Sequence, residues 1–412
     1  MCFRFKISIL FLLVITVLTG CWSRRELNDL AIVVAIGIDQ AENGQYLVSA
    51  QVVNPAEIAS QSGSGAGTIN YSPITTYQAK ADTIVEALRK ITTVSPRKIY
   101  VSHIRMLVIG EEVAKNGIAN VLDFFSRDHE FRTDFFITVT KDTTAEKVLS
   151  VYTELEKIPA NKLFNSLEMS ERYWAPTRGV FLDELLSDLI LEGKEPVLTA
   201  ITITGDYETG EEETNVQEII QDAQLKYENI GVFKKDKLVG WLNTEESKGF
   251  NYITGTVNNT VGHMSCPDGG KFSKEQIVAK SKITPKIVNG KPEIFVHIWT
   301  ESNIAEVNCQ IDLSKMETIK QLEKLASGEI EKHANLAIEK AQKEFQSDIF
   351  GFGDLIYRKN PKTWKKLKDH WDEAFSAMPV HVKVDVHIRR FGTIENSFLE
   401  ELNSTSEEKE SE

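Results

Sequence analysis

Cys21 is the residue of this 412-residue sequence whose surroundings predict a defined chemistry. It follows the short stretch Leu-Thr-Gly (18–20) and an apolar run (7–18), and Arg4 and Lys6 place positive charge before that run. This order of basic, apolar and small residues is typical of an export signal. The ending Leu-Thr-Gly-Cys resembles a bacterial lipobox, in which the cysteine thiol receives a diacylglycerol. We therefore predict lipid attachment at Cys21 and removal of the segment before it.

An uncleaved membrane-spanning helix is the main alternative for this run. Such a helix needs about 20 apolar residues, and the run is shorter. A buried core helix would rarely open a chain with two cations so close to its start. Lipid attachment also agrees with the energetics, because each buried methylene contributes about 0.8 kcal/mol and a single chain binds only marginally. Two or three acyl chains are therefore expected to hold the protein at a membrane.

Composition and charge argue against several classes of function. The precursor has a net charge of −13, which becomes −15 when the two signal cations, Arg4 and Lys6, are removed. Such a chain lacks the basic face of a nucleic-acid binder and is not attracted to an anionic membrane surface. No second apolar run of channel-forming length occurs. The predicted lipid, and not surface charge, would then hold the protein in place.

Two cysteines remain for the mature body after the signal and the lipidated cysteine are set aside. Cys266 and Cys309 fit no CxxC metal or redox spacing. An exported protein can form a disulfide, but sequence alone gives no geometry for one. We interpret the pair as two unpaired, partly buried thiols and keep the disulfide as the alternative.

The first half of the chain alternates strands and helices, which predicts helices packed on a sheet. The dipeptide Asn43-Gly44 predicts a hairpin turn. We expect strands at 30–39, 45–53, 99–109, 135–140 and 196–204, and helices at 84–91, 113–125, 145–154, 161–171 and 179–190.

The second half is predicted to contain antiparallel strands and one long helix. Alternation of valine or isoleucine with polar residues over 380–390 indicates a half-buried antiparallel strand. Ser314 and Glu317 have the spacing of a capping box, which predicts the start of the long helix. We expect the other strands at 225–234, 237–243, 276–288 and 292–308, and a shorter helix at 361–375.

The predicted fold class is therefore α+β or mixed α/β with several domains. The acidic segment 206–222 has little apolar surface to bury, so it is interpreted as a linker. The predicted units are a signal peptide (1–20), an N-terminal α/β region that could hold two subdomains (21–205), the linker (206–222), a C-terminal α+β domain (223–392) and a disordered acidic tail (393–412).

Other candidate sites do not support catalysis or metal binding. His129-Glu130 begins like a zinc-protease helix, but Thr133 stands where the second histidine is needed. His381 and His387 share a strand face yet would lie about 20 Å apart. The glycine-rich stretch 63–67 lacks the Gly-Lys-Ser/Thr of a phosphate loop. We predict no catalytic residue, no metal and no cofactor.

The segment 348–358 (DIFGFGDLIYR) is the densest unusual stretch of the sequence. Its glycines and aromatic residues favour a structural hinge packed against neighbouring elements. A partner-binding surface is the alternative function for the same residues.

Five segments in order together resemble the Ger(x)C family, the lipoprotein C subunits of nutrient germinant receptors. Each motif is weak alone, but their order is specific, and Ser23 stands where relatives are often acidic. The segments are GCWSRRELNDL (20–30) with Gly-Ile-Asp (37–39), SHIR (102–105) with VIGEE (108–112) and LDFFSRD (122–128), EKIPA (156–160), GVFK (231–234) with KLVGWL (237–242), and KAQ (340–342) with SDIFGFG (347–353), Tyr357, Pro361, Trp364 and Trp371.

The resemblance implies a three-domain mixed fold, anchored by lipid on the outer face of the spore inner membrane. It implies assembly with the integral-membrane A and B subunits of a receptor for amino acids or sugars, and no enzymatic activity. A solute-binding lipoprotein of a transporter is the alternative, but the strand-rich second half does not match the first as a second lobe would. An extracytoplasmic hydrolase would need a nucleophile motif that the sequence lacks.

Overall fold

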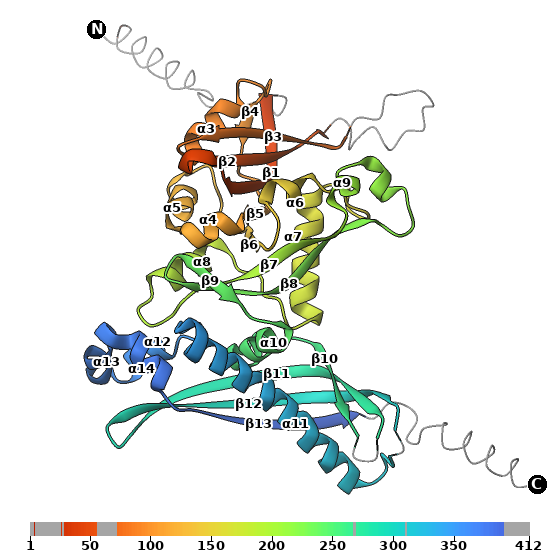
Figure 1. Ribbon diagram of the computed structural model, residues 1–412, viewed down its shortest axis with the longest axis vertical. Helices are drawn as coiled ribbons and strands as arrows, with labels where there is room; N and C mark the ends of the chain where they lie inside the picture. The colour runs from red at the N-terminus through yellow and green to blue at the C-terminus, as the bar shows by residue number, and fades with distance from the viewer. Residues whose placement is uncertain are drawn as a thin grey trace, which may run out of the picture.

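The computed structural model contains two β-sheets that follow one another along the longest axis of the molecule (Figure 1). Helices cover both faces of the first sheet, and helices α10 and α11 lie on the second. This architecture confirms the predicted α+β class. The structure describes Arg4, Glu26 and residues 29–55, 72–266, 269–309 and 311–390.

The first sheet has the strand order β3-β2-β1-β5-β6-β7-β8-β9, with the short strand β4 paired to β1. Its central strands β1, β5, β6 and β7 run parallel, and the outer strands on each side run antiparallel. The strands are β1 (Leu30–Gln40), β2 (Tyr46–Val53), β3 (Ile74–Ala81), β4 (Lys98–Tyr100), β5 (Met106–Ile109), β6 (Phe136–Thr140), β7 (Val197–Gly205), β8 (Ala223–Lys234) and β9 (Lys237–Trp241).

Local turn chemistry fixes the hairpins of both sheets. Asn43 and Gly44 both have positive φ angles, of 58° and 80°, which few other residues adopt without strain. The same pattern recurs at Asn289-Gly290, between β11 (Lys271–Val288) and β12 (Lys291–Val307). The predicted hairpins around these dipeptides are confirmed.

Two separate apolar layers cover the two faces of the first sheet. One layer packs α3, α4, α5 and α8 against the strands, and the other packs α6 and α7. The helical segments of this half are α3 (Ile84–Ile91), α4 (Glu111–Asn116), α5 (Ala119–Arg127), α6 (Ala145–Ser150), α7 (Pro159–Tyr173), α8 (Leu182–Ile190), α9 (Tyr207–Gly210), and the short turns η2 (Glu42–Gly44) and η3 (Glu213–Val216).

Two predicted elements of this half are each split in the structure. The predicted strand 99–109 consists of β4 and β5, which pair with β1 on either side of a register shift between Val33 and Ala35. The predicted helix 113–125 consists of α4 and α5, because Gly117 adopts a φ of 129° between them. In both cases the pattern of apolar residues runs on across a break in the backbone, so the sequence predicted one element where the structure has two.

The first sheet continues across the predicted linker 206–222. Strands β7 and β8 lie on either side of this segment and pair with each other. The buried side chain of Asn215 donates to the Ala223 carbonyl and accepts from the Ala223 amide, both at 3.0 Å, so it holds the segment against β8. The change from the first sheet to the second therefore falls after β9, and not within 206–222.

The second sheet has the order β10-β11-β12-β13, with β10 (Thr260–Ser265) and β13 (Val380–Arg390) at its edges. The prediction of an antiparallel strand at 380–390 was wrong, because β13 runs parallel to β12. Parallel strands need a long connection, which α11 to α14 provide. The remaining helical segments are α10 (Thr244–Thr254), α11 (Met316–Glu339), η4 (Lys340–Phe345), α12 (Phe352–Lys359), α13 (Pro361–Leu367), η5 (Lys368–His370) and α14 (Trp371–Ala377).

The capping box predicted for the long helix is not formed. Helix α11 begins at Met316, and its N-cap residue Lys315 makes no capping bond through its side chain. The amide and hydroxyl of Ser314 instead donate to the Asp312 carboxylate, at 2.9 and 2.5 Å. A local bond of this kind competes with a helix cap for the same serine.

Cys266 and Cys309 form a disulfide, so the interpretation of two unpaired thiols was wrong. Cys266 follows β10 and Cys309 follows β12, and both strands pair with β11, which lies between them. This arrangement brings the two Cα atoms to 6.4 Å although 43 positions separate the residues. Sheet pairing, which sequence spacing does not reveal, is the physical reason for the bridge.

Removing this disulfide is expected to lower the free energy of unfolding by about 2–4 kcal/mol, because the bridge restricts a long loop of the unfolded chain. Chemical denaturation of the double variant C266S/C309S measures the loss. A reducing agent should shift the unfolding curve of the wild type by the same amount and leave that of the double variant unchanged. Equal stability of variant and wild type would contradict the expectation.

Candidate functional site

The predicted lipid-attachment residue, Cys21, lies outside the described residues, as does the glycine-rich stretch 63–67. Within the described ranges, no helix combines the length and apolar character needed to cross a membrane. The same residues include no group of three or more His, Cys, Asp and Glu side chains placed to hold a metal ion.

The histidines considered in the sequence lie apart from one another and contact acidic side chains. On β13, His381 lies 2.8 Å from a Glu293 carboxylate oxygen, and His387 lies 3.2 Å from one of Glu323. His129 is exposed on the loop after α5. These contacts on the surface of the protein agree with a solvated polar face.

The glycine-rich segment 348–353 connects the second sheet to the first. The buried Asp348 carboxylate accepts from the amides of Phe352 and Gly353, at 3.1 and 2.8 Å, and so holds the turn before α12. The main-chain carbonyl of Asp348 accepts a hydrogen bond from the Glu195 amide at 2.9 Å. The Asp354 amide donates to the Gly193 carbonyl at 3.2 Å. Burial raises the pKa of Asp348 to about 7. The segment therefore packs within the molecule, as the structural interpretation predicted.

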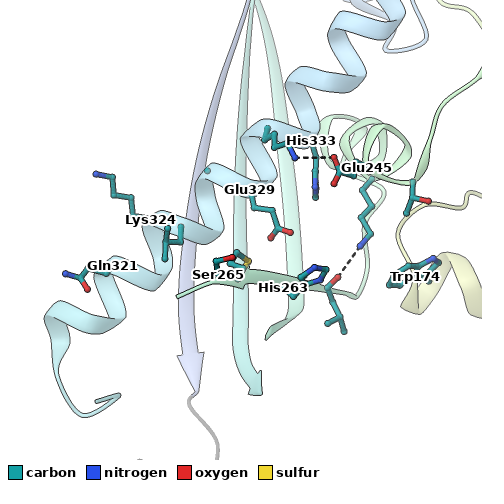
Figure 2. A pocket seen from close by; sticks show the side chains of 16 residues that line it. Trp174, Glu245, His263, Ser265, Gln321, Lys324, Glu329 and His333 are labelled. Carbon is teal, nitrogen blue, oxygen red and sulfur yellow. Dashed lines mark hydrogen bonds and ion pairs between the residues drawn. The ribbon is translucent and has the colours of Figure 1, made fainter. Parts of the chain in front are cut away.

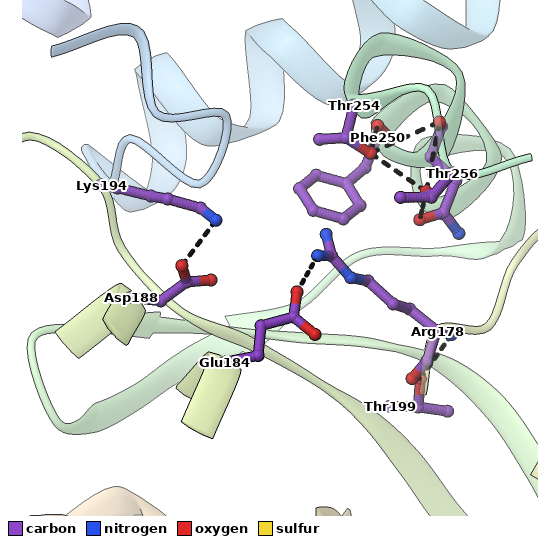
Figure 3. A network of polar contacts seen from close by, with 9 residues as sticks. Arg178, Glu184, Asp188, Lys194, Thr199, Phe250, Thr254 and Thr256 are labelled. Carbon is purple, nitrogen blue, oxygen red and sulfur yellow. Dashed lines mark hydrogen bonds and ion pairs between the residues drawn. The ribbon is translucent and has the colours of Figure 1, made fainter. Parts of the chain in front are cut away.

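A second set of polar contacts joins the loop before α8 to helix α10 (Figure 3). Arg178 forms an ion pair with Glu184, and its guanidinium lies 5.8 Å from the centre of the Phe250 ring. The Asn251 amide group donates to the Ala175 carbonyl at 2.5 Å and to that of Thr177 at 3.2 Å. Because these groups are buried or half-buried, they fix the position of α10 against the first sheet.

A groove of about 1130 Å³ lies between helix α11 and edge strand β10, next to α10 (Figure 2). Three large apolar side chains that are exposed to solvent line it: Trp174, Val261 and Leu325. The ammonium group of Lys248 lies 4.2 Å from the centre of the Trp174 ring and donates to the Val261 carbonyl at 3.2 Å. We call this feature the α11–β10 groove.

Charged groups gather at the floor of the α11–β10 groove. Figure 2 shows Glu329 pointing from α11 into the space above β10. A Cβ atom on Gly262 would lie 2.9 Å from the Glu329 Oε2 atom, so the glycine leaves room for this carboxylate. Lys274, the partner of Gly262 in the ladder, is only 1% exposed. Glu329 Oε2 is buried and has no hydrogen-bond partner among the residues that the structure describes.

The pKa values of these groups follow from their burial. Burial, helped by the neighbouring Lys248 and opposed by Glu329, lowers the pKa of Lys274 to about 8. Burial raises the pKa of Glu329, and Lys274 and Lys248 oppose that shift. The groove is lined by three lysines, Lys248, Lys324 and Lys332, and two carboxylates, Glu245 and Glu329, and Lys274 lies buried beside its lining residue Gly262. Excess positive charge therefore gathers here in a chain of net charge −13.

Replacing Lys274 with methionine is expected to stabilise the protein by about 1–3 kcal/mol at pH 7, because a poorly compensated buried charge is removed. The folded-state pKa of about 8 lies below the unfolded value of 10.5, so the penalty is fully present below pH 8. It should fade as the pH rises to 10.5. Denaturation of K274M across this range measures the gain, with the exposed K280M on the same strand as control. Destabilisation by K274M would contradict the expectation.

No pattern in the sequence signals this groove directly. The predicted strand began at residue 276, so it excluded Lys274, and a lysine in an alternating pattern is normally assigned to the solvent face. Thr260 and Gln276 share the inner face with Lys274, and each has a buried polar atom for which the described part of the chain supplies no partner. Only the packing of α11 over β10 brings these groups together.

Comparison with known proteins defines the class to which this fold belongs. A family model described as "Spore germination protein N-terminal domain" matches residues 23–203, and one described as "Spore germination B3/ GerAC like, C-terminal" matches residues 228–392. Together they span both sheets. The chain belongs to the Ger(x)C family of spore germination proteins, which confirms the predicted resemblance.

Individual relatives match over nearly the whole chain. The chain is 34% identical to "Spore germination protein KC" of Bacillus subtilis (strain 168), over 95% of this chain and 96% of the relative. It is 25% identical to "Spore germination protein B3" of the same organism, over 94% of this chain and 98% of the relative. A solved structure titled "Crystal Structure of the GerBC protein" has the same fold, with a TM-score of 0.51 and 20% identity over 86% of this chain and 96% of that chain.

Proposed function

We propose that this protein is the lipid-anchored subunit of a spore nutrient germinant receptor. Membership of the Ger(x)C family over both halves of the chain is the observation that carries this proposal. In this role the protein docks on integral-membrane A and B subunits at the outer face of the spore inner membrane. It helps them assemble or transmits the binding of a nutrient, and it catalyses no reaction.

Two further observations support an extracytoplasmic, membrane-tethered body. The Cys266–Cys309 disulfide is of the kind that persists in oxidising compartments. The lipobox-like sequence at Cys21 offers attachment through acyl chains, and lipid tethering raises the local concentration of the body near partners in the same membrane.

Co-purification from spore membranes tests the proposed assembly. An affinity tag after Glu412 should recover the integral-membrane A and B subunits together with this protein after detergent extraction. A control strain carries the same tag on another lipoprotein of the same membrane and should not recover them. Recovery of the tagged protein alone, under conditions in which the A and B subunits are present in the extract, would contradict the proposal.

A further inference from the structure

The α11–β10 groove has the dimensions of an extended peptide segment. Its residues on α11 run from Gln321 to His333, which is about 18 Å of helix at 1.5 Å per residue. An extended chain advances about 3.3 Å per residue, so five or six residues span the same length. Gly328, midway along the helix side, leaves open space where a side chain would stand.

The outer edge of β10 borders this groove and presents main-chain groups to it. The Asn259 amide donates to the Arg172 carbonyl, and the Val261 carbonyl accepts from the Lys248 ammonium group. The main-chain N–H and C=O groups of the odd-numbered residues therefore point away from β11. In an antiparallel ladder this direction alternates along the strand. The N–H and C=O of His263 therefore point outward, and in the described part of the chain no hydrogen bond is found for them.

The opposite edge of the second sheet is closed along the last part of β13. The Val386 and Ile388 amides of β13 donate to the side chains of Ser327 and Glu323 on α11, at 3.3 and 2.9 Å. These bonds occupy main-chain donors that a free edge strand would offer to another chain. On β10 the main-chain groups of His263 remain available to a further strand, and they lie next to the groove.

The charges of the groove specify which segment would fit. The lysines that line it, Lys248, Lys324 and Lys332, outnumber its carboxylates, Glu245 and Glu329, so a carboxylate on the bound segment would balance the charge. Trp174, Val261 and Leu325 offer apolar surface to alternate side chains.

We propose that the α11–β10 groove binds an extended, acidic and apolar segment of a partner protein, which adds as a strand to the outer edge of β10. This inference goes beyond the proposed receptor role, because it names a docking surface and the chemistry of its partner. It depends on the folded second sheet and not on the lipid anchor, so a failure of anchoring would leave it standing.

Binding of peptide libraries to the purified full chain in detergent tests the proposal. One library consists of hexapeptides that alternate Asp or Glu with Val, Leu or Phe, and the matched library carries Lys in place of the acidic residues. We expect the wild type to retain the acidic library about tenfold more than the basic one, a difference of about 1.4 kcal/mol. Equal retention, or retention of neither library, would overturn the proposal.

Two variants separate strand addition from simple attraction of carboxylates. H263P removes the outward amide without breaking the ladder to β11, because proline is tolerated where the amide faces away from the sheet. It should lower retention of the acidic library about tenfold, whereas H263A should retain it. G328Y fills the groove and favours helix, and it should also abolish retention, in contrast to K320Y on the exposed surface outside the groove. Unchanged retention by both H263P and G328Y would overturn the proposal.

Discussion

Replacing Cys21 with alanine is expected to move the protein from the membrane fraction to the soluble fraction of disrupted spores. The physical reason is that the proposed acyl chains would supply the binding energy, at about 0.8 kcal/mol per buried methylene. The net charge of the chain is negative, and no described helix can span a membrane. Germination through the proposed receptor should fail in the same variant, because the subunit would no longer be concentrated beside its partners.

The measurement is quantitative fractionation of C21A spores, followed by germination in a nutrient to which the parent strain responds. C2A, a change within the predicted signal, is the matched control and should leave both readouts unchanged. Membrane retention of C21A at the parental level would contradict lipid attachment at this residue.

A methyl group added at Gly353 is expected to lower the free energy of unfolding by about 3 kcal/mol, because overpacking of a buried contact forces the backbone apart. A Cβ atom at this position would lie 2.7 Å from the Gly193 Cα atom and 2.8 Å from the rings of both Trp364 and Trp371. Two backbone segments and two large rings meet here, so no flexible side chain can move aside. The two sheets should then separate more readily in G353A.

Chemical denaturation followed by tryptophan fluorescence measures this effect, since Trp364 and Trp371 lie at the contact. G328A is the matched control: it sits in the interior of α11, with open space around the added methyl group. That variant should gain up to about 1 kcal/mol, because alanine favours helix more than glycine does. Similar losses in both variants would show that the close contact at Gly353 is not the cause.

The features that the sequence predicted well are those decided by a few neighbouring residues. Asn43-Gly44 and Asn289-Gly290 both form the expected turns, and the valine alternation over 380–390 correctly placed Val384, Val386 and Ile388 in the core. The direction of β13 was missed because it depends on where α11 to α14 return the chain, and the residues of the strand do not encode that path.

Features that depend on contacts between residues far apart in the sequence could not be predicted, for the same reason. The Cys266–Cys309 bridge requires β11 to lie between the strands that carry the two cysteines. Lys274 is buried because α11 crosses above it, and a lysine between polar neighbours gives no sign of burial. The lipid-attachment prediction at Cys21 needs no tertiary contact, but it falls outside the described residues and stays a prediction.

The pairing of β7 with β8 across residues 206–222 has a consequence for the proposed export of the protein. A secreted chain emerges with its N-terminus first, and domains generally fold as units in that order. The first sheet lacks its last two strands until Trp241 has crossed the membrane, so 30–241, and not 21–205, is the smallest segment able to complete it. Pausing of translocation between residues 205 and 241 would leave the edge of β7 open to aggregation. The rate at which the acidic segment emerges thus becomes a determinant of yield, independent of the stability of the finished protein.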